Sequence, residues 1–369
     1  MAEPLKYMYD KSFISELIGF SEHIIPGFDA VKFSTHFFNP YWDSLELKQR
    51  VKHVADAMAD QLSGNYLRDI EVVTQLTKHI MVQLNGATTF THIFIADYIE
   101  RYGINHPEES LNAMEYATII SSCEFAIRPF IVKYPDMVMS QMLHWTNHPH
   151  ASVRRLASEG CRPRLPWGMA LVAFKKDPSP ILPILEQLKN DPSEYVRKSV
   201  ANNLNDIAKD NPEVVTDIIK AWKGSSKETD WILKHGSRTL LKKADKHTLS
   251  LFGVSAVSSA TVTDLKVKHD IINIGGVLQF SFVLMHKEKL ATVLRVEYLI
   301  YYRKSNGSLS KKIFKVTEQA FQSIKPQTIS RKQSFKDMTT RKHYAGEHQL
   351  AIVVNGVELS KTSFMVNKD

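Results

Sequence analysis

Cysteine is almost absent from this sequence: Cys123 and Cys161 are its only two cysteines in 369 residues. Two thiols cannot build a disulfide framework, and neither has the spaced partners of a zinc site. The sequence also has no Gly-rich phosphate loop of the P-loop or Rossmann kind and no cluster of metal ligands. We therefore expect reduced thiols, no cofactor and no metal, which argues against disulfide-rich secreted domains and against enzymes that hold nucleotides on such loops.

Long apolar runs are missing as well. No stretch reaches the length that a helix needs to cross a bilayer, and the first residues, MAEPLKYMYDKSF, carry charge where a signal peptide needs an apolar segment. We expect a cytoplasmic, monomeric protein with no membrane partner. A chain of 369 residues is long enough for two domains, each with its own core.

Positive charge is unevenly divided along the chain. The formal net charge is +8, and residues 254–369 hold 18 Lys and Arg against 9 Asp and Glu, whereas residues 1–253 hold 29 against 30. A basic module joined to a near-neutral one is typical of a protein whose small domain holds a polyanion while the large domain acts more selectively. A basic surface that serves only solubility is the alternative.

The near-neutral region has the periodicity of helices. Apolar residues recur at helical spacing over residues 44–62, 70–84, 89–102 and 108–120, with no strand-like alternation between them. Asp43, with Glu46 three residues later, predicts the cap of the first helix. Further along, Glu124 lies among apolar neighbours, which is unusual for a carboxylate unless it is paired or used, although an exposed helix turn would also explain it.

An internal repeat organises the next part of the chain. The segment HPHASVRRLASEG from His148 aligns with DPSEYVRKSVANN from Asp191 at a period of 43 residues. The aligned pairs are Pro149 with Pro192, Val153 with Val196, Arg154 with Arg197, Arg155 with Lys198, and Glu159 with Asn202. This period is typical of HEAT-like helix pairs, which stack into a curved solenoid. Asp206 lies one further turn along, so charged side chains should recur on one stripe that lines the concave face.

The densest group of reactive residue types is VRRLASEGCRPRLPW, from Val153 to Trp167. It should begin as an amphipathic helix. Four arginines around one carboxylate and one tryptophan favour an anionic partner. For Arg154 the alternative is a structural role within the repeat. For Arg155 and Glu159 it is an exposed ion pair worth about 0.3–0.5 kcal/mol, and for Trp167 it is packing against the next helix.

After residue 253 the periodicity changes from helix to strand. The small and hydroxyl residues of the segment VSAVSSAT, which begins at Val254, predict a linker over residues 254–260. Apolar residues then alternate with polar or small ones, as from Leu278 to Leu284, and Asn306-Gly307 and Asn355-Gly356 predict hairpin turns. About seven short strands predict an immunoglobulin-like β-sandwich over residues 261–369.

The motifs VRRLASEGCRPRLPW and VRKSVANNLNDIAKDNP resemble the AlkC family of bacterial alkylation-repair DNA glycosylases, relatives of the AlkD enzymes. The resemblance extends over nearly the whole chain, because that family also joins a helical-repeat domain to a C-terminal immunoglobulin-like domain. We accordingly expect an α-solenoid of HEAT-like repeats with the catalytic site over residues 1–253, a linker over 254–260 and a separate, basic, DNA-contacting β-sandwich over 261–369.

The resemblance implies that Glu159, Trp167 and Asp206 are catalytic, and Glu124 is carried over from less distinctive surroundings. It also implies that basic side chains of both domains contact DNA: Arg155, Arg162, Arg164, Lys198, Arg331, Lys332, Lys336, Arg341 and Lys342. For the stretch at 331–344, a plain solvated strand and loop is the alternative.

The implied reaction excises cationic N3-alkylated bases, such as 3-methyladenine and 3-methylcytosine, from double-stranded DNA without flipping the base out. The base already carries positive charge, so the enzyme must mainly stabilise an oxocarbenium-like sugar and position a water, which carboxylates do. A tryptophan face can contact the cation. Two alternatives stay open. One is a non-catalytic scaffold that binds DNA or protein, in which Glu159 and Asp206 are exposed, far apart or paired with basic groups. The other is an enzyme that acts on RNA or free nucleotides.

Overall fold

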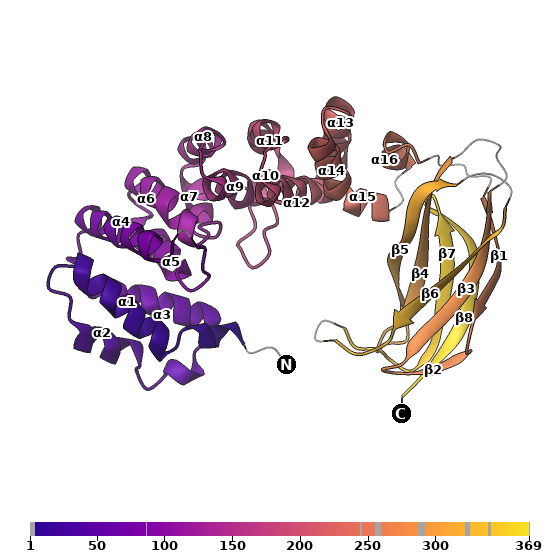
Figure 1. Cartoon of the computed structure of the whole chain (residues 1–369), viewed down its shortest axis with the longest axis horizontal. Coiled ribbons are helices and arrows are strands. Elements are labelled where there is room, and N and C mark those ends of the chain that lie inside the picture. Colours follow the sequence, from indigo (N-terminus) through magenta and orange to yellow (C-terminus); the bar gives the residue numbers. More distant parts are fainter. Residues whose placement is uncertain are drawn as a thin grey trace. The chain divides into compact units, whose positions relative to one another are not determined.

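The first unit of the computed structural model, Met1–Gly236, forms helices and connecting loops in its described residues, and Ser237–Asp369 forms a second unit (Figure 1). The structure describes residues 4–85, 87–243, 246–254, 260–286, 292–321, 325–338 and 341–368. The helices of the first unit are η1 (Leu5–Met8), α1 (Lys11–Ile24), α2 (Ala30–Phe37), η2 (Trp42–Ser44), α3 (Leu47–Ala59), α4 (Tyr66–Gln83), α5 (Ile93–Gly103), α6 (Pro107–Ile120), α7 (Ile127–Lys133), α8 (Pro135–Trp145), α9 (Ala151–Gly160), α10 (Val172–Lys176), η3 (Ser179–Ile181), α11 (Leu182–Leu188), α12 (Glu194–Asp210), α13 (Pro212–Trp222) and α14 (Lys227–Gly236).

Local sequence explains where these helices begin. The side chains of Asp10, Asp29 and Asn65 accept hydrogen bonds from backbone N–H groups three residues on, which caps α1, α2 and α4. Proline occupies the first position of α6, α8 and α13, where its missing N–H costs nothing.

The helix expected over residues 44–62 is shorter, because α3 runs from Leu47 to Ala59. The Glu46 side chain accepts from the backbone of Gln49, and the Gln49 side chain accepts from the Glu46 N–H at 2.8 Å. The prediction of Asp43 as the cap is therefore wrong by one turn, since Asp43 lies in the short helix η2.

Successive helices of the first unit lie side by side in sequence order. α3 packs on α5, α9 on α12 and α12 on α14, while α4 packs on α6. Figure 1 shows α9 and α12 along the lower side of this array and α8, α11 and α13 along its upper side. On α9 the predicted core face is buried at Val153, Leu156 and Ala157.

The repeat of 43 residues has a structural counterpart. Arg154 and Arg197 each donate through Nη1 to the carbonyls six and five residues earlier, at 2.9 and 2.8 Å for Arg154 and at 2.7 and 2.8 Å for Arg197. Arg154 also forms a two-pronged ion pair with Asp191, the residue that opens the second segment. Arg154 is therefore a structural element of the repeat, as its alternative interpretation predicted.

The second unit contains a β-sandwich of two sheets, ordered β1-β3-β6 and β2-β8-β7-β4-β5 (Figure 1). Its strands are β1 (Ala260–Val267), β2 (Ile271–Asn273), β3 (Val277–His286), β4 (Thr292–Arg303), β5 (Leu309–Phe321), β6 (Gln327–Ser334), β7 (Gly346–Val354) and β8 (Val357–Asn367). The alternating residues of β3, from Leu278 to Leu284, are buried between the sheets, which confirms the predicted alternation. The turn at Asn355-Gly356 joins β7 to β8 with φ values of 48° and 80°, the left-handed conformation that these residues tolerate.

Two short helices, α15 (Arg238–Lys242) and α16 (Lys246–Leu251), belong to the second unit. Leu241 and Leu249 form a small apolar cluster with Val254, and Val293 at the start of β4 packs against it. These helices are thus associated with the sandwich although they precede the expected boundary at residue 253, which stays a prediction. Most of the expected linker, residues 255–259, lies outside the described residues.

Candidate active site

The three expected catalytic carboxylates come from neighbouring elements of the helical unit. Glu159 lies on the last turn of α9, Asp206 lies on α12, and Glu124 lies in the turn before α7. Trp167 lies in the loop that joins α9 to α10, which we call the site loop (residues 161–171). The packing of α9 on α12 brings Glu159 and Asp206 together although 47 residues separate them in sequence.

The carboxylates alternate with basic groups in one continuous array. Arg155 donates to Glu124 at 2.7 Å and lies 3.5 Å from Glu159. Arg162 donates from Nη1 to Glu159 Oε1 at 2.6 Å and from Nε to Asp206 Oδ2 at 2.9 Å. The array ends with a bond from the Lys209 ammonium to the other Asp206 oxygen at 2.9 Å. We call this set the charged array.

The centre of the charged array is buried. Exposed fractions are 4% for Glu159, 6% for Arg162 and 1% for Asp206. Burial removes the hydration of an ion, and an ion pair offsets this loss. Arg162 forms ion pairs with both buried carboxylates. Glu159 Oε2 nevertheless has no hydrogen-bond partner among the described residues. That oxygen is itself buried, so one carboxylate oxygen is left without a partner within the array.

The arginines of the array remain charged in these surroundings. Burial lowers the pKa of Arg162, but attraction to Glu159 and Asp206 outweighs it, so that the net pKa is raised. Burial also lowers the pKa of Arg155, but attraction to Glu124 and Glu159 raises it by more, so the net pKa is raised. The array is held as a fixed pattern of ions, which is the preorganisation that electrostatic catalysis requires.

A cavity of about 310 Å³ opens beside the charged array, and we call it the catalytic pocket. It is lined by Phe90, Glu124, Phe125, Glu159, Arg162, Leu165, Pro166 and Trp167. Trp167 has a positive φ of 66°, a rare conformation for a bulky residue, and its side chain is 67% exposed. Such backbone strain persists only where surrounding contacts impose it, and it recurs at functional sites. The tryptophan is therefore largely exposed to solvent, and its contact with a ligand stays a prediction.

Two basic side chains impose the conformation of the site loop. Arg128 of α7 is fully buried and donates to the carbonyls of Gly160 and Met169, each at 2.7 Å, so it ties both ends of the loop. Lys48 of α3 donates to the carbonyl of Trp167 at 2.9 Å. The loop that carries Arg162 and Trp167 is thus fastened to two helices that precede it in the chain.

Sequence reasoning missed Arg128, Lys48 and Tyr195. The Arg155 guanidinium lies 4.5 Å from the centre of the Tyr195 ring, and this half-exposed tyrosine supports it by a cation–π contact. Tyr195 stands one position before the Val-Arg pair of the second repeat, so the repeat offered a signal for it. No sequence pattern marked Arg128 or Lys48, because both act on backbone carbonyls far along the chain.

The other basic residues expected on the helical unit are already engaged with carboxylates. Arg164 pairs with Asp210 through two hydrogen bonds, and Lys198 is exposed and pairs with Glu194 at 2.8 Å. Arg155 and Arg162 belong to the charged array. Surface pairs of this kind contribute at most about 1 kcal/mol and can exchange for a phosphate, whereas the buried Arg162 cannot. The DNA role of these residues stays a prediction, and for Arg162 the geometry favours organising the carboxylates.

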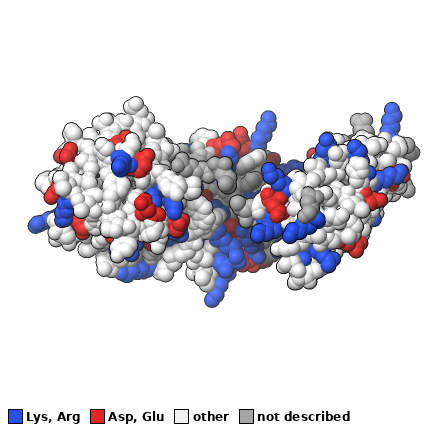
Figure 2. Space-filling model, turned by 90° about the horizontal axis from the view of Figure 1, so that it is seen from below, with Lys and Arg blue, Asp and Glu red and all other residues white. Residues whose placement is uncertain are grey.

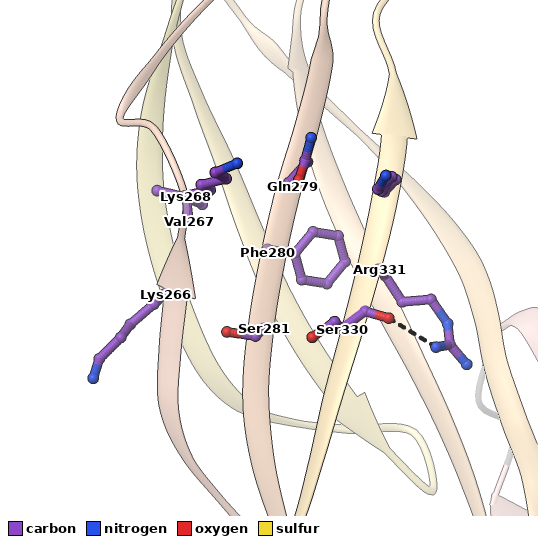
Figure 3. Close-up of a pocket in the computed structure, with 9 residues that line it drawn as sticks. Lys266, Val267, Lys268, Gln279, Phe280, Ser281, Ser330 and Arg331 are labelled. Atoms are coloured by element: carbon purple, nitrogen blue, oxygen red, sulfur yellow. Dashed lines mark hydrogen bonds between the residues drawn. The ribbon is translucent and has the colours of Figure 1, made fainter.

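The expected basic residues of the sandwich have the opposite character. Arg331 and Lys332 on β6 are exposed, and both line an open cavity of about 480 Å³ (Figure 3). Two further lysines line this cavity: Lys266 on β1, and Lys268 just after the end of β1. Within the described part of the chain, Arg331 donates to two backbone carbonyls, those of Ser330 and Val316, and to no side chain. Lys336 and Lys342 are also exposed, and Arg341 lies over the Tyr302 ring at 5.1 Å. Two residues of this stretch, 339 and 340, lie outside the described residues.

The charge division expected from the sequence is visible on the surface. Figure 2 shows Lys and Arg spread over the sandwich unit with fewer acidic side chains between them, whereas both signs mix on the helical unit. Among the described residues no three His, Cys, Asp or Glu side chains are grouped to hold a metal ion. No described helix is long and apolar enough to cross a membrane. Both cysteines are buried free thiols.

Known proteins resemble this chain in sequence and in fold. A family model described as "DNA alkylation repair enzyme" matches residues 105–247, and one for the C-terminal Ig-like domain of the uncharacterised protein YhaZ matches residues 261–368. The YhaZ protein of Bacillus subtilis (strain 168) is 42% identical over 362 residues, which cover 98% of this chain and 99% of YhaZ. The solved structure of Pseudomonas fluorescens alkylpurine DNA glycosylase AlkC, bound to DNA containing an abasic site analog, is 34% identical, with a TM-score of 0.93 over 99% of this chain and 100% of that one.

Fold, site and comparisons together define the class of protein: this is a DNA alkylation repair enzyme with a helical domain and an immunoglobulin-like sandwich. Within that class the chain belongs to the AlkC family of DNA glycosylases, which confirms the resemblance drawn from its motifs. The scaffold alternative expected Glu159 and Asp206 to be exposed, far apart or paired with basic groups. They are paired with Arg162, yet they are buried and adjacent, and membership of the enzyme family decides against a scaffold.

Proposed function

We propose that this glycosylase removes cationic N3-alkylated bases, 3-methyladenine and 3-methylcytosine among them, from double-stranded DNA. The observation that carries the proposal is the charged array beside Trp167, in which Glu159 keeps one oxygen without a partner among the described residues. Three carboxylates fixed within one array suit a reaction whose transition state gains positive charge on the sugar. The related AlkC structure contains DNA with an abasic site analog, which supports DNA as the partner.

The chemistry follows from the charge of the lesion. When the bond between C1′ and the base nitrogen breaks, its electron pair neutralises the cationic base, and the positive charge moves to the sugar. A water then adds to C1′, and its proton passes to a carboxylate or to solvent. Glu159 is the candidate for contact with the sugar cation or this water, because its Oε2 has no partner among the described residues.

The remaining residues prepare this step. Arg162 holds Glu159 and Asp206 in place through ion pairs, and Arg155 holds Glu124 in the same way. The electron-rich face of Trp167, which is largely exposed, is available to contact the sugar or the cationic base. A lesion that is already cationic needs no general acid. The enzyme can then act on a base that stays stacked in the duplex, and we propose that it does so.

Basic side chains of both units hold the duplex. We propose that the exposed Arg331 and Lys332 contact backbone phosphates, and that Arg164 and Lys198 exchange their surface carboxylate partners for phosphates near the lesion. Such contacts carry no sequence information, which suits an enzyme whose target is a chemical lesion rather than a base sequence.

The test is an excision assay. Purified protein is incubated with methylated duplex DNA, and released 3-methyladenine and 3-methylcytosine are quantified, in parallel with Glu159→Gln. We expect release by the wild type and its loss in the variant with an unchanged circular dichroism spectrum. Release of neither base by the wild type would overturn the proposed substrate, and undiminished release by Glu159→Gln would remove that residue from the mechanism.

A further inference from the structure

A second cavity, of about 270 Å³, lies against the catalytic pocket, and we call it the rear cavity. It is lined by residues of α3, of α5 and the loop before it, of the turn before α7 and of the site loop. Three aromatic residues, Phe90, Phe125 and Trp167, line both cavities and so form the partition between them. Only one wall separates the rear cavity from the place where the glycosidic bond would be cut.

The walls of the rear cavity are mostly apolar. Besides the aromatic partition they include Leu47, Val51, Ile93, Ala96 and Met169. A mostly apolar cavity of this volume with aromatic walls suits a planar ring rather than a chain of water molecules, which would find few hydrogen-bond partners along such walls. A single nucleobase is a ring system of the right class.

Two acids of α5, Asp97 and Glu100, supply the polar part of this lining together with Lys48 and Ser122. Asp97 lies 3.4 Å from Arg101, and the Lys48 ammonium is bonded to the carbonyl of Trp167. The Glu100 carboxyl has no hydrogen-bond partner among the described residues although the residue is partly buried. An acid without a protein partner at the wall of an apolar cavity is placed to bind a ligand.

The ionisation of Glu100 fits a nitrogen heterocycle. Burial, with a further contribution from Asp97, raises the pKa of Glu100 to about 7, so both forms of the carboxyl are populated near neutral pH. The protonated form donates to a ring nitrogen, and the ionised form accepts from an amino group or from a protonated ring. A free alkylated purine presents a ring nitrogen and an exocyclic amino group on one edge, so either form has a complement.

We propose that the rear cavity binds the alkylated base after its release, with the ring among the apolar walls and its polar edge on Glu100. This inference rests on the proposed function, because that function supplies the base on the other side of the partition. Movement of the exposed Trp167 side chain would open the way. Removal of the base from the catalytic pocket would prevent it from recombining with the sugar.

The experiment is a direct binding measurement on the full chain without DNA. Free 3-methyladenine is titrated into the wild type, Glu100→Gln and Glu71→Gln, and binding is followed by isothermal titration calorimetry. Glu71 is the matched control, since it is an exposed acid that lines a separate groove between α4 and α6. We expect saturable binding at one site, unchanged in Glu71→Gln and weakened roughly tenfold in Glu100→Gln, the loss expected for one hydrogen bond to a charged group.

A second variant fills the cavity without a change of charge. Ala96→Leu adds volume at a buried position of the lining and should abolish binding, and circular dichroism checks that the variant is folded. No binding to the wild type, or equal binding to all four proteins, would overturn the inference. The excision assay is independent of this measurement: release of the base from DNA by a protein that does not bind the free base would leave the proposed function intact and reject the rear cavity alone.

Discussion

Arginine serves opposite purposes in the two units of this protein. In the helical unit Arg155 and Arg162 are largely buried and each contacts two carboxylates. In the sandwich Arg331 is exposed, and among the described residues it donates to backbone carbonyls alone. A buried, paired arginine cannot attract a distant polyanion, but it holds its carboxylates in fixed positions. An exposed arginine can attract a distant polyanion, but it does not hold carboxylates in fixed positions. Under the proposed function, the same residue type organises the carboxylates in one unit and attracts DNA in the other.

The largest effect should come from a change inside the charged array. Asp206→Asn removes a buried charge that Arg162 and Lys209 both contact, and we expect the excision rate to fall roughly a hundredfold or more. Asp210→Asn, one turn further along α12, breaks only the surface pair with Arg164 and should cost less than about tenfold. Single-turnover excision rates on methylated duplex DNA provide the measurement. Equal losses in the two variants would contradict the distinction between buried and surface pairs.

A smaller effect is expected where a basic residue acts on the backbone. Lys48→Met removes the donor to the Trp167 carbonyl, so the strained site loop should relax and the excision rate should fall about tenfold. Because Lys48 is exposed, the free energy of unfolding should change by only about 0.5 kcal/mol. Lys52→Met changes another exposed lysine one turn along the same helix. It is the control for both the excision rate and the free energy of unfolding. An unchanged excision rate in Lys48→Met would show that other contacts suffice to hold the loop.

The sandwich should respond differently, in binding rather than in catalysis. The double variant Arg331→Ala/Lys332→Ala should weaken binding to duplex DNA several-fold and reduce the slope of log K against log salt concentration by about 2, one phosphate for each residue. The matched control is Lys311→Ala/Lys312→Ala, which removes two exposed lysines from β5 in the other sheet. If the control lowers the slope equally, the β6 surface has no special role.

The smallest effect is the pH dependence of stability at Glu100. Its pKa is raised from 4.5 to about 7 in the folded protein, so the unfolded chain ionises first as the pH rises. At low pH Glu100 is protonated in both states and does not lower the free energy of unfolding. Its ionisation lowers that free energy as the pH rises from about 4.5 to 7, and the destabilisation is largest above pH 7. Glu100→Gln should melt at the same temperature as the wild type near pH 4 and a few degrees higher at pH 8. A constant difference across this range would contradict the raised pKa.

Much of the fold was accessible from local sequence. The helical periodicity before residue 236, the strand alternation from Leu278 to Leu284 and the turn at Asn355-Gly356 all appear in the structure, because each depends on residues close together in the chain. The repeat register also predicted that Arg154 and Arg197 are equivalent. The cap of α3 was placed at the wrong acid, since Asp43 and Glu46 offer the same side-chain chemistry and only the course of the backbone chooses between them.

The sequence by itself determined that this chain has a helical, near-neutral part and a basic, strand-forming part, and it marked Glu159, Asp206 and Trp167 as site candidates. It could not show that Arg162 would bridge the two acids instead of facing solvent, because that pairing depends on how α9 packs on α12. Nor could it reveal that Arg128 and Lys48 hold the site loop, or that Glu100 faces a cavity behind Trp167. Burial and long-range contact decide the ionisation and orientation of these groups, and both arise only once the chain has folded.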